Sequence, residues 1–95
     1  MVLNMSESKI DRATITIEEC SELIQALSKF SRYVLGDKTL RNTKEDIYCM
    51  VKEELVDVMI CVDKMLDVFE ISDEEIDSIM NFKVQRYEKL IRNND

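Results

Sequence analysis

The 95-residue chain has a single Gly and no Pro, Trp or His. Sandwiches and barrels of β-strands need frequent turns, and those turns draw on Gly and Pro, so a chain poor in both is predicted to be all-α. The absence of His excludes Ser-His and Cys-His nucleophile pairs, Glu-x-x-His di-iron sites and His-ligated zinc. Carboxylates remain as the main side chains for catalysis and for metal binding.

Basic residues are also scarce relative to acidic ones, with 13 Lys and Arg against 20 Asp and Glu and a net charge of −7. Nucleic acids and anionic membranes are bound through a surplus of Lys and Arg, so neither is expected as a partner. No apolar run approaches the ~20 residues that span a membrane, and no signal peptide is recognised. With three widely spaced cysteines expected as buried thiols, the sequence predicts a single domain, 1–95, in the cytoplasm.

Capping signals and apolar periodicity predict three helices. Thr16 has a Glu three residues later, the spacing of a capping box, and Gly36 suits the position just after a helix. Thr43 and Ser72 likewise have acidic residues three positions on. The predicted helices span about 17–35, 44–69 and 73–92, and residues 1–14 are a poorly defined N-terminal segment.

A turn of 100° per residue places four acidic side chains on or beside the packing faces of the first two helices. Glu19 and Glu22 lie on a shoulder of the first apolar stripe, Glu54 projects from the centre of the second, and Asp57 lies one turn on. A carboxylate in an apolar face is costly unless it is paired or bound to a metal. An ion pair between Glu54 and Lys83, in the middle of the apolar face of the third helix, is one explanation, but one lysine does not neutralise four carboxylates.

If the first two helices pack antiparallel, the two acidic pairs converge. Four oxygen ligands without nitrogen or thiolate suit Mg²⁺, with Mn²⁺ as a possible substitute. Because Mg²⁺ keeps waters and recruits phosphate oxygens, the cluster suggests polyphosphate chemistry. Lys83, Arg86 and Tyr87 are neighbours on one face of the third helix and are the candidates for binding phosphate.

The segments Glu18–Leu23 and Glu53–Val58 resemble the Glu-x-x-Glu and Glu-x-x-Asp signature of MazG-like all-α nucleoside triphosphate pyrophosphohydrolases. That superfamily also includes the all-α dUTPases and phosphoribosyl-ATP pyrophosphohydrolase, and the similarity covers about Ile15 to Arg92. It implies Mg²⁺-dependent cleavage of a nucleoside triphosphate substrate to a monophosphate and pyrophosphate. Within it, the ligands are Glu19, Glu22, Glu54 and Asp57, the water is activated by Glu19 or Glu18, and phosphate is bound by Lys83, Arg86 and Tyr87.

The resemblance also implies a homodimer or homotetramer. Independent support comes from the second helix, which has apolar residues beyond a single stripe: Tyr48, Met59, Ile60 and Leu66. Three helices cannot cover so broad a face, so the sequence predicts that oligomerisation completes a four-helix-type core. Two alternatives to the enzyme stay open, an inactive helical oligomer that binds nucleotide or a protein partner, and a structural bundle whose acids are solvated or ion-paired.

Overall fold

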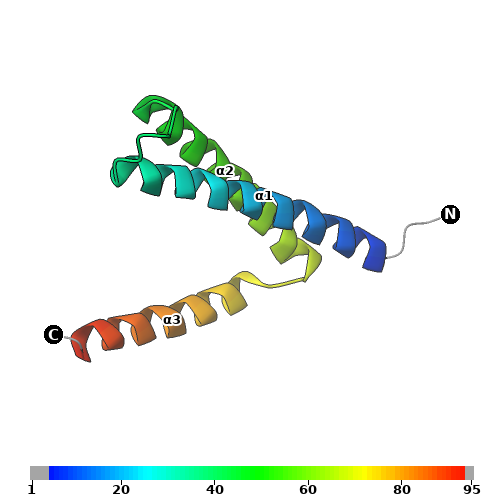
Figure 1. The fold of residues 1–95 in the computed structure, drawn as a ribbon. Helices are drawn as coiled ribbons and strands as arrows, with labels where there is room; N and C mark the ends of the chain where they lie inside the picture. Colours follow the sequence, from blue (N-terminus) through cyan, green and yellow to red (C-terminus); the bar gives the residue numbers. More distant parts are fainter. Residues whose placement is uncertain (1–4, 94–95) are drawn as a thin grey trace. The chain divides into compact units, whose positions relative to one another are not determined.

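The computed structural model describes residues 5–93, with side chains from position 9 onward, and in this range it contains three α-helices and no strand (Figure 1). The helices are α1 (Met5–Val34), α2 (Lys44–Val68) and α3 (Asp73–Asn93). The all-α prediction is therefore confirmed. The chain divides into two compact units, one ending at Met65 and one beginning at Leu66, and each is described by itself. None of the three helices combines the length and apolarity that crossing a bilayer requires.

The beginning of the first helix differs from the prediction. A start at residue 17 with Thr16 as the cap was wrong, because α1 begins at Met5 and Thr16 lies in its interior. The Thr16 hydroxyl donates a hydrogen bond of 2.8 Å to the carbonyl of Arg12, one turn earlier, which is how a threonine is satisfied within a helix. Residues 5–14 of the segment expected to be poorly defined are thus helical, and residues 1–4 lie outside the described range.

A capping box opens α2 as predicted, and Ser72 caps α3 at the predicted position. The backbone N–H of Asp46 donates to the Thr43 hydroxyl at 3.1 Å, and the N–H of Thr43 donates back to the Asp46 carboxylate at 3.2 Å. At the start of α3, the N–H of Glu75 donates to the Ser72 hydroxyl at 3.1 Å. Each cap satisfies backbone donors that the first turn of a helix leaves free, and is typically worth about 1 kcal/mol.

The end of α1 is fixed by a left-handed residue and a charged loop. Gly36 has a φ of 77°, and the N–H of Asp37 reaches back to the Arg32 carbonyl at 2.9 Å, the bond that closes a Schellman motif. The Asp37 carboxylate accepts a 2.7 Å hydrogen bond from Arg32 Nε and bonds from the N–H and hydroxyl of Thr39. The Thr39 hydroxyl and the Arg32 guanidinium lower the pKa of Asp37 to about 2. This loop reverses the chain between α1 and α2.

In the first unit, α1 and α2 form an antiparallel hairpin (Figure 1). The rings of Phe30 and Tyr48 lie 5.9 Å apart near the loop, and Ala26 and Ile47 are 2% and 0% exposed. Side chains spaced alternately by three and four residues line the contact, which we call the seam. The seam consists of Thr16, Glu19, Leu23, Ala26 and Phe30 from α1, and Ile47, Val51, Glu54, Val58, Cys61 and Met65 from α2. Two of its eleven positions are glutamates.

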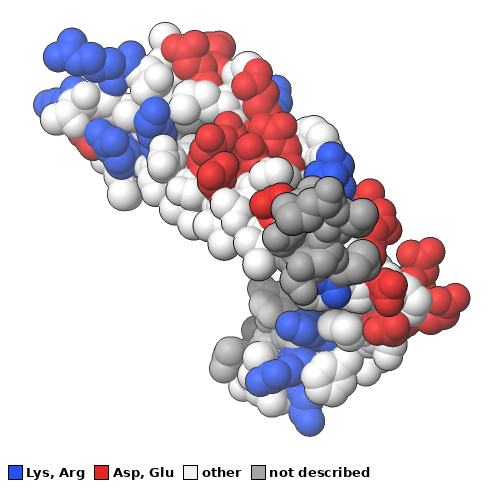
Figure 2. Space-filling view, turned by 90° about the vertical axis from the view of Figure 1, so that its right-hand side faces the viewer, with Lys and Arg blue, Asp and Glu red and all other residues white. Residues whose placement is uncertain are grey.

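The hairpin has two chemically different sides. Because the helices run in opposite directions, residues that follow seam positions lie on one side and residues that precede them lie on the other. The apolar side consists of Ile17, Ile24, Leu27, Tyr48, Leu55, Met59 and Val62, each at least 41% exposed. The acidic side carries Glu18, Glu22, Glu53 and Asp57, all exposed. Acidic residues gather in patches in the space-filling view rather than spreading evenly over the surface (Figure 2).

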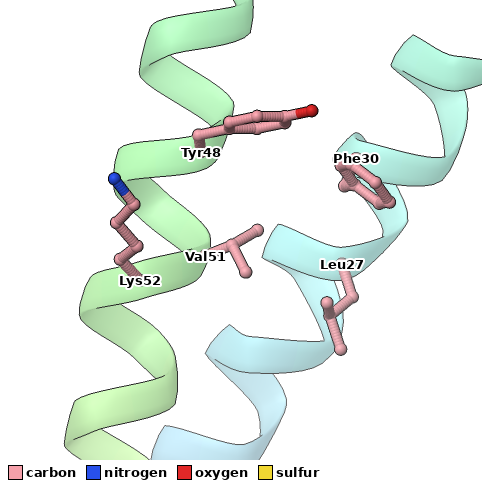
Figure 3. Close-up of a pocket in the computed structure, with 5 residues that line it drawn as sticks. All are labelled: Leu27, Phe30, Tyr48, Val51 and Lys52. Atoms are coloured by element: carbon pink, nitrogen blue, oxygen red, sulfur yellow. The ribbon is translucent and has the colours of Figure 1, made fainter.

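A cavity of about 330 Å³ lies between the helices near the loop. Figure 3 shows Tyr48 and Val51 of α2 directed toward Phe30 and Leu27 of α1, with Lys52 completing the lining. Apart from Lys52 and the Tyr48 hydroxyl, the lining side chains offer no polar group to a ligand. The lining of this cavity is therefore mainly apolar, with two polar groups, and it includes none of the four clustered acids.

Candidate functional site

Three of the four predicted metal ligands come together at the middle of the hairpin. Each of Glu19, Glu22 and Glu54 has a carboxylate oxygen within 4.8 Å of those of the other two. Glu19 and Glu22 are one helical turn apart on α1, and Glu54 reaches them across the seam from α2. The antiparallel register of the two helices brings the acids together, which is the arrangement that the spacing of the sequence predicts.

Asp57 and Glu18 lie at the margin of this cluster. Both side chains are exposed on the acidic side, and neither belongs to the group of three converging oxygens. Their negative charges nevertheless affect the cluster. Asp57 helps to raise the pKa of both Glu19 and Glu54, and Glu18 raises the pKa of Glu19 by a smaller amount. The structure thus places Asp57 beside the cluster, as a fourth carboxylate at its solvent edge.

Burial affects the three converging acids unequally. Glu19 and Glu54 are half-buried because they occupy seam positions, whereas Glu22 is exposed. Atom Oε2 of Glu19 and atom Oε2 of Glu54 are buried, and neither has a hydrogen-bond partner. A buried carboxylate oxygen without a partner is unfavourable, so these two atoms mark where the cluster has an energetic cost.

Burial and neighbouring charge also shift the pKa values of the two seam glutamates. Burial raises the pKa of Glu19 and of Glu54, and the negative charges of Glu22 and Asp57 raise both further. Every group that shifts these two pKa values is another carboxylate, and each contribution favours the protonated form. Without a cation, the site is therefore a concentration of mutually repelling negative charge.

The donor set suits a hard divalent cation. All the converging atoms are carboxylate oxygens, the ligand type that Mg²⁺, Mn²⁺ and Ca²⁺ prefer. Opposite ligands of an octahedral Mg²⁺ ion are about 4 Å apart, so oxygens within 4.8 Å of one another need only small side-chain movements to share one ion. The partly exposed edge at Glu22 leaves room for waters or for the oxygens of a substrate.

The predicted phosphate-binding residues belong to the other unit. Lys83, Arg86 and Tyr87 lie on α3 at neighbouring positions of one helix face, and all three are exposed. Because the two units are described separately, the role of these residues at the carboxylate cluster stays a prediction. The same holds for the proposed ion pair between Glu54 and Lys83.

Two basic residues near the cluster were missed in the sequence. Arg12 of α1 and Lys64 of α2 line a narrow cavity between the helices, and Lys64 lies on the acidic side. Arg12 was overlooked because the first helix was expected to begin after it. A sequence signal existed, since Ile10 and Ile17 repeat at the seven-residue spacing that continues to Ile24.

Comparison of the chain with protein-family models, with curated proteins and with solved structures gives no match.

Proposed function

We propose that this protein is a Mg²⁺-dependent nucleoside triphosphate pyrophosphohydrolase, which cleaves ribo- or deoxynucleoside triphosphates to monophosphate and pyrophosphate. The observation that supports it is the convergence of oxygens from Glu19, Glu22 and Glu54 at the seam, with two buried oxygens lacking partners. Acids are retained in such a place where a cation compensates their charge. The resemblance of the two acidic segments to the MazG-like signature supplies the reaction class.

In this proposal, Glu19, Glu22, Glu54 and Asp57 hold the metal. A bound Mg²⁺ or Mn²⁺ supplies charge neutralisation at the phosphates and a water of lowered pKa. Glu19 or the adjacent Glu18 would accept the proton of the attacking water. Lys83, Arg86 and Tyr87 bind phosphate oxygens from α3.

The proposal includes a homodimer or homotetramer. The apolar side of the hairpin exposes seven large side chains, from 41% at Tyr48 to 68% at Ile17 and Met59. Monomeric proteins rarely leave such an area open to water. Two hairpins that stack through their apolar sides form a four-helix core, and both acidic sides remain outside it.

The decisive experiment measures pyrophosphate release from a panel of ribo- and deoxynucleoside triphosphates, with and without Mg²⁺ or Mn²⁺. We expect metal-dependent release that Glu54→Gln lowers by about 100-fold or more, because the substitution removes a ligand charge. Glu53→Gln is the matched control, since it makes the same change at the adjacent, exposed position. Circular dichroism confirms that both variants stay helical. Failure of the intact oligomer to turn over any nucleotide would exclude the enzyme.

The same preparation tests the two alternatives. Nucleotide that raises the unfolding temperature without being hydrolysed would indicate a binding protein rather than an enzyme. The structural ion pair is tested by Lys83→Met: a large loss of stability in the metal-free protein would show that Lys83 serves Glu54. Our proposal expects a rise in KM for the nucleotide instead, with little change in unfolding temperature.

A further inference from the structure

We propose that Arg12 and Lys64 form a binding position for the terminal phosphates of a polyphosphate ligand, beside the carboxylate cluster and within the same hairpin. The assignment of that ligand as substrate rests on the proposed function. The binding position itself follows from the geometry and charge of the first unit and can be tested without turnover.

The position is a notch between the two helices. Its lining consists of Arg12, Ile15 and Thr16 of α1 and Ile60, Cys61 and Lys64 of α2, and its volume is about 40 Å³. Cys61 is the most buried of the six, at 8% exposed. The Thr16 hydroxyl donates its proton to the carbonyl of Arg12, so it is not available as a donor to a ligand. The volume is enough for one water or one phosphate oxygen, so the rest of a phosphate group lies at the mouth, between the two cationic side chains.

The charges at the notch are unbalanced. Arg12 and Lys64 approach from facing helices and are both exposed. Among the described side chains, neither Arg12 nor Lys64 takes part in an ion pair. Two cations at one notch attract an anion, and a phosphate group can accept hydrogen bonds from the guanidinium and the ammonium together.

The notch also has a suitable relation to the carboxylate cluster. Arg12 lies seven residues before Glu19, and Lys64 lies seven residues after Asp57. Seven residues are two helical turns, about 10 Å along the axis, so each base lies on nearly the same face of its helix as the corresponding acid. A polyphosphate whose first phosphates share a cation with the carboxylates can contact Arg12 and Lys64 with its last one if these two long side chains extend toward the cluster. Pyrophosphate, the leaving group of the proposed reaction, has this chemistry.

Calorimetric titration with inorganic pyrophosphate in the presence of Mg²⁺ tests the proposal. The double variant Arg12→Gln/Lys64→Gln should bind pyrophosphate about tenfold more weakly or worse, since it loses both charge-assisted donors. Lys38→Gln/Arg41→Gln makes the same charge change in the exposed loop and should bind as the wild type does. Arg12→Lys/Lys64→Arg keeps both charges and should restore most of the affinity, which separates a charge effect from misfolding.

The metal site provides a second readout. The rise in unfolding temperature caused by Mn²⁺ alone should be the same in the wild type and in Arg12→Gln/Lys64→Gln, because these residues are not ligands. Unchanged pyrophosphate affinity in that variant, or no binding by the wild type, would overturn the inference. If pyrophosphate binding depends on the pair but no nucleotide is hydrolysed, the proposed function fails and the inference stands. If nucleotides are hydrolysed with unchanged KM and unchanged pyrophosphate affinity in the variant, the inference alone fails.

Discussion

Glu19 and Glu54 occupy positions where an antiparallel helix pair normally places apolar side chains. Their neighbours along the seam, Leu23 and Val58, are of that kind. The energetic cost of placing glutamates at these seam positions shows in the raised pKa values of Glu19 and Glu54 and in their buried oxygens without hydrogen-bond partners. A cation shared by the two acids, as we propose, would offset this cost.

The raised pKa values predict an unusual dependence of stability on pH. When the folded protein holds a proton more tightly than the unfolded chain, stability is full below the ordinary pKa of 4.5 and is lost as the pH rises through the raised value. Thermal unfolding of the metal-free protein should therefore show a rising midpoint as the pH is lowered from 7 toward 4.5. Saturating Mg²⁺ should flatten this trend, because the cation favours the ionised carboxylates.

Asp37 affects the pH dependence of stability in the opposite direction to Glu19 and Glu54, and over a lower range of pH. Its pKa is lowered to about 2, so its stabilising contribution is present above the ordinary value of 3.8 and is lost as the pH falls toward 2. The double variant Glu19→Gln/Glu54→Gln serves as the control and should lose the trend above pH 4.5 while keeping the decline below 3.8. A wild-type midpoint that falls steadily from pH 7 to 4.5 without metal would contradict the assignment of raised pKa values.

At the scale of the elements, local chemistry predicted most helix ends. Thr43, Ser72 and Gly36 act as the sequence indicates, because each satisfies backbone groups within a few residues of itself. The start of α1 could not be found in this way. Thr16 has the spacing of a cap, but the helix already extends from Met5 and the Thr16 hydroxyl bonds within it. Residues 12–16 also share a cavity lining with α2, a tertiary contact that capping signals do not report.

A pair of substitutions tests the corrected boundary. Thr43→Ala removes a genuine cap and should lower the free energy of unfolding by about 1 kcal/mol. Thr16→Ala removes a hydroxyl that is bonded within the helix, and because alanine is the better helix former it should change stability by no more than a few tenths of a kcal/mol. Urea denaturation followed by circular dichroism measures both. An equal decrease in the free energy of unfolding in both variants would indicate that Thr16 is a cap and that the helix begins there.

At the scale of the whole molecule, the sequence predicts the convergence of Glu19, Glu22, Glu54 and Asp57, of which the structure brings the first three together, but not the division of the hairpin into two sides. The convergence follows from two i, i+3 pairs and an antiparallel turn, which are short-range features. The two sides depend on the register between α1 and α2, and on a first helix twelve residues longer than expected at its start. The same extension brings Arg12 to the cavity that Lys64 also lines, so this pair depends on the longer helix as well as on the register.

The polarity of the two sides predicts how copies of the chain associate. Leu55 and Val62 lie on the apolar side, each 45% exposed, and Leu55 directly follows Glu54 of the cluster. Light scattering after size exclusion should give the wild type a mass at least twice the 11.2 kDa of one chain. Leu55→Glu/Val62→Glu should yield monomers, because two charges in the centre of a four-helix core are not tolerated. Leu55→Met/Val62→Ile, which keeps the side apolar, should leave the mass unchanged.

A matched substitution on the opposite side completes this test. The single variants Glu53→Lys and Asp57→Lys each change the charge by two, as Leu55→Glu/Val62→Glu does. Both lie on the acidic side, which remains outside the proposed core. Their mass should therefore equal that of the wild type, while Asp57→Lys should also abolish the rise in unfolding temperature caused by Mg²⁺. Monomers from substitutions on the acidic side, with oligomers retained by Leu55→Glu/Val62→Glu, would place the interface over the carboxylates. That outcome would argue against a metal site open to substrate, because the cluster would then be covered by the second copy.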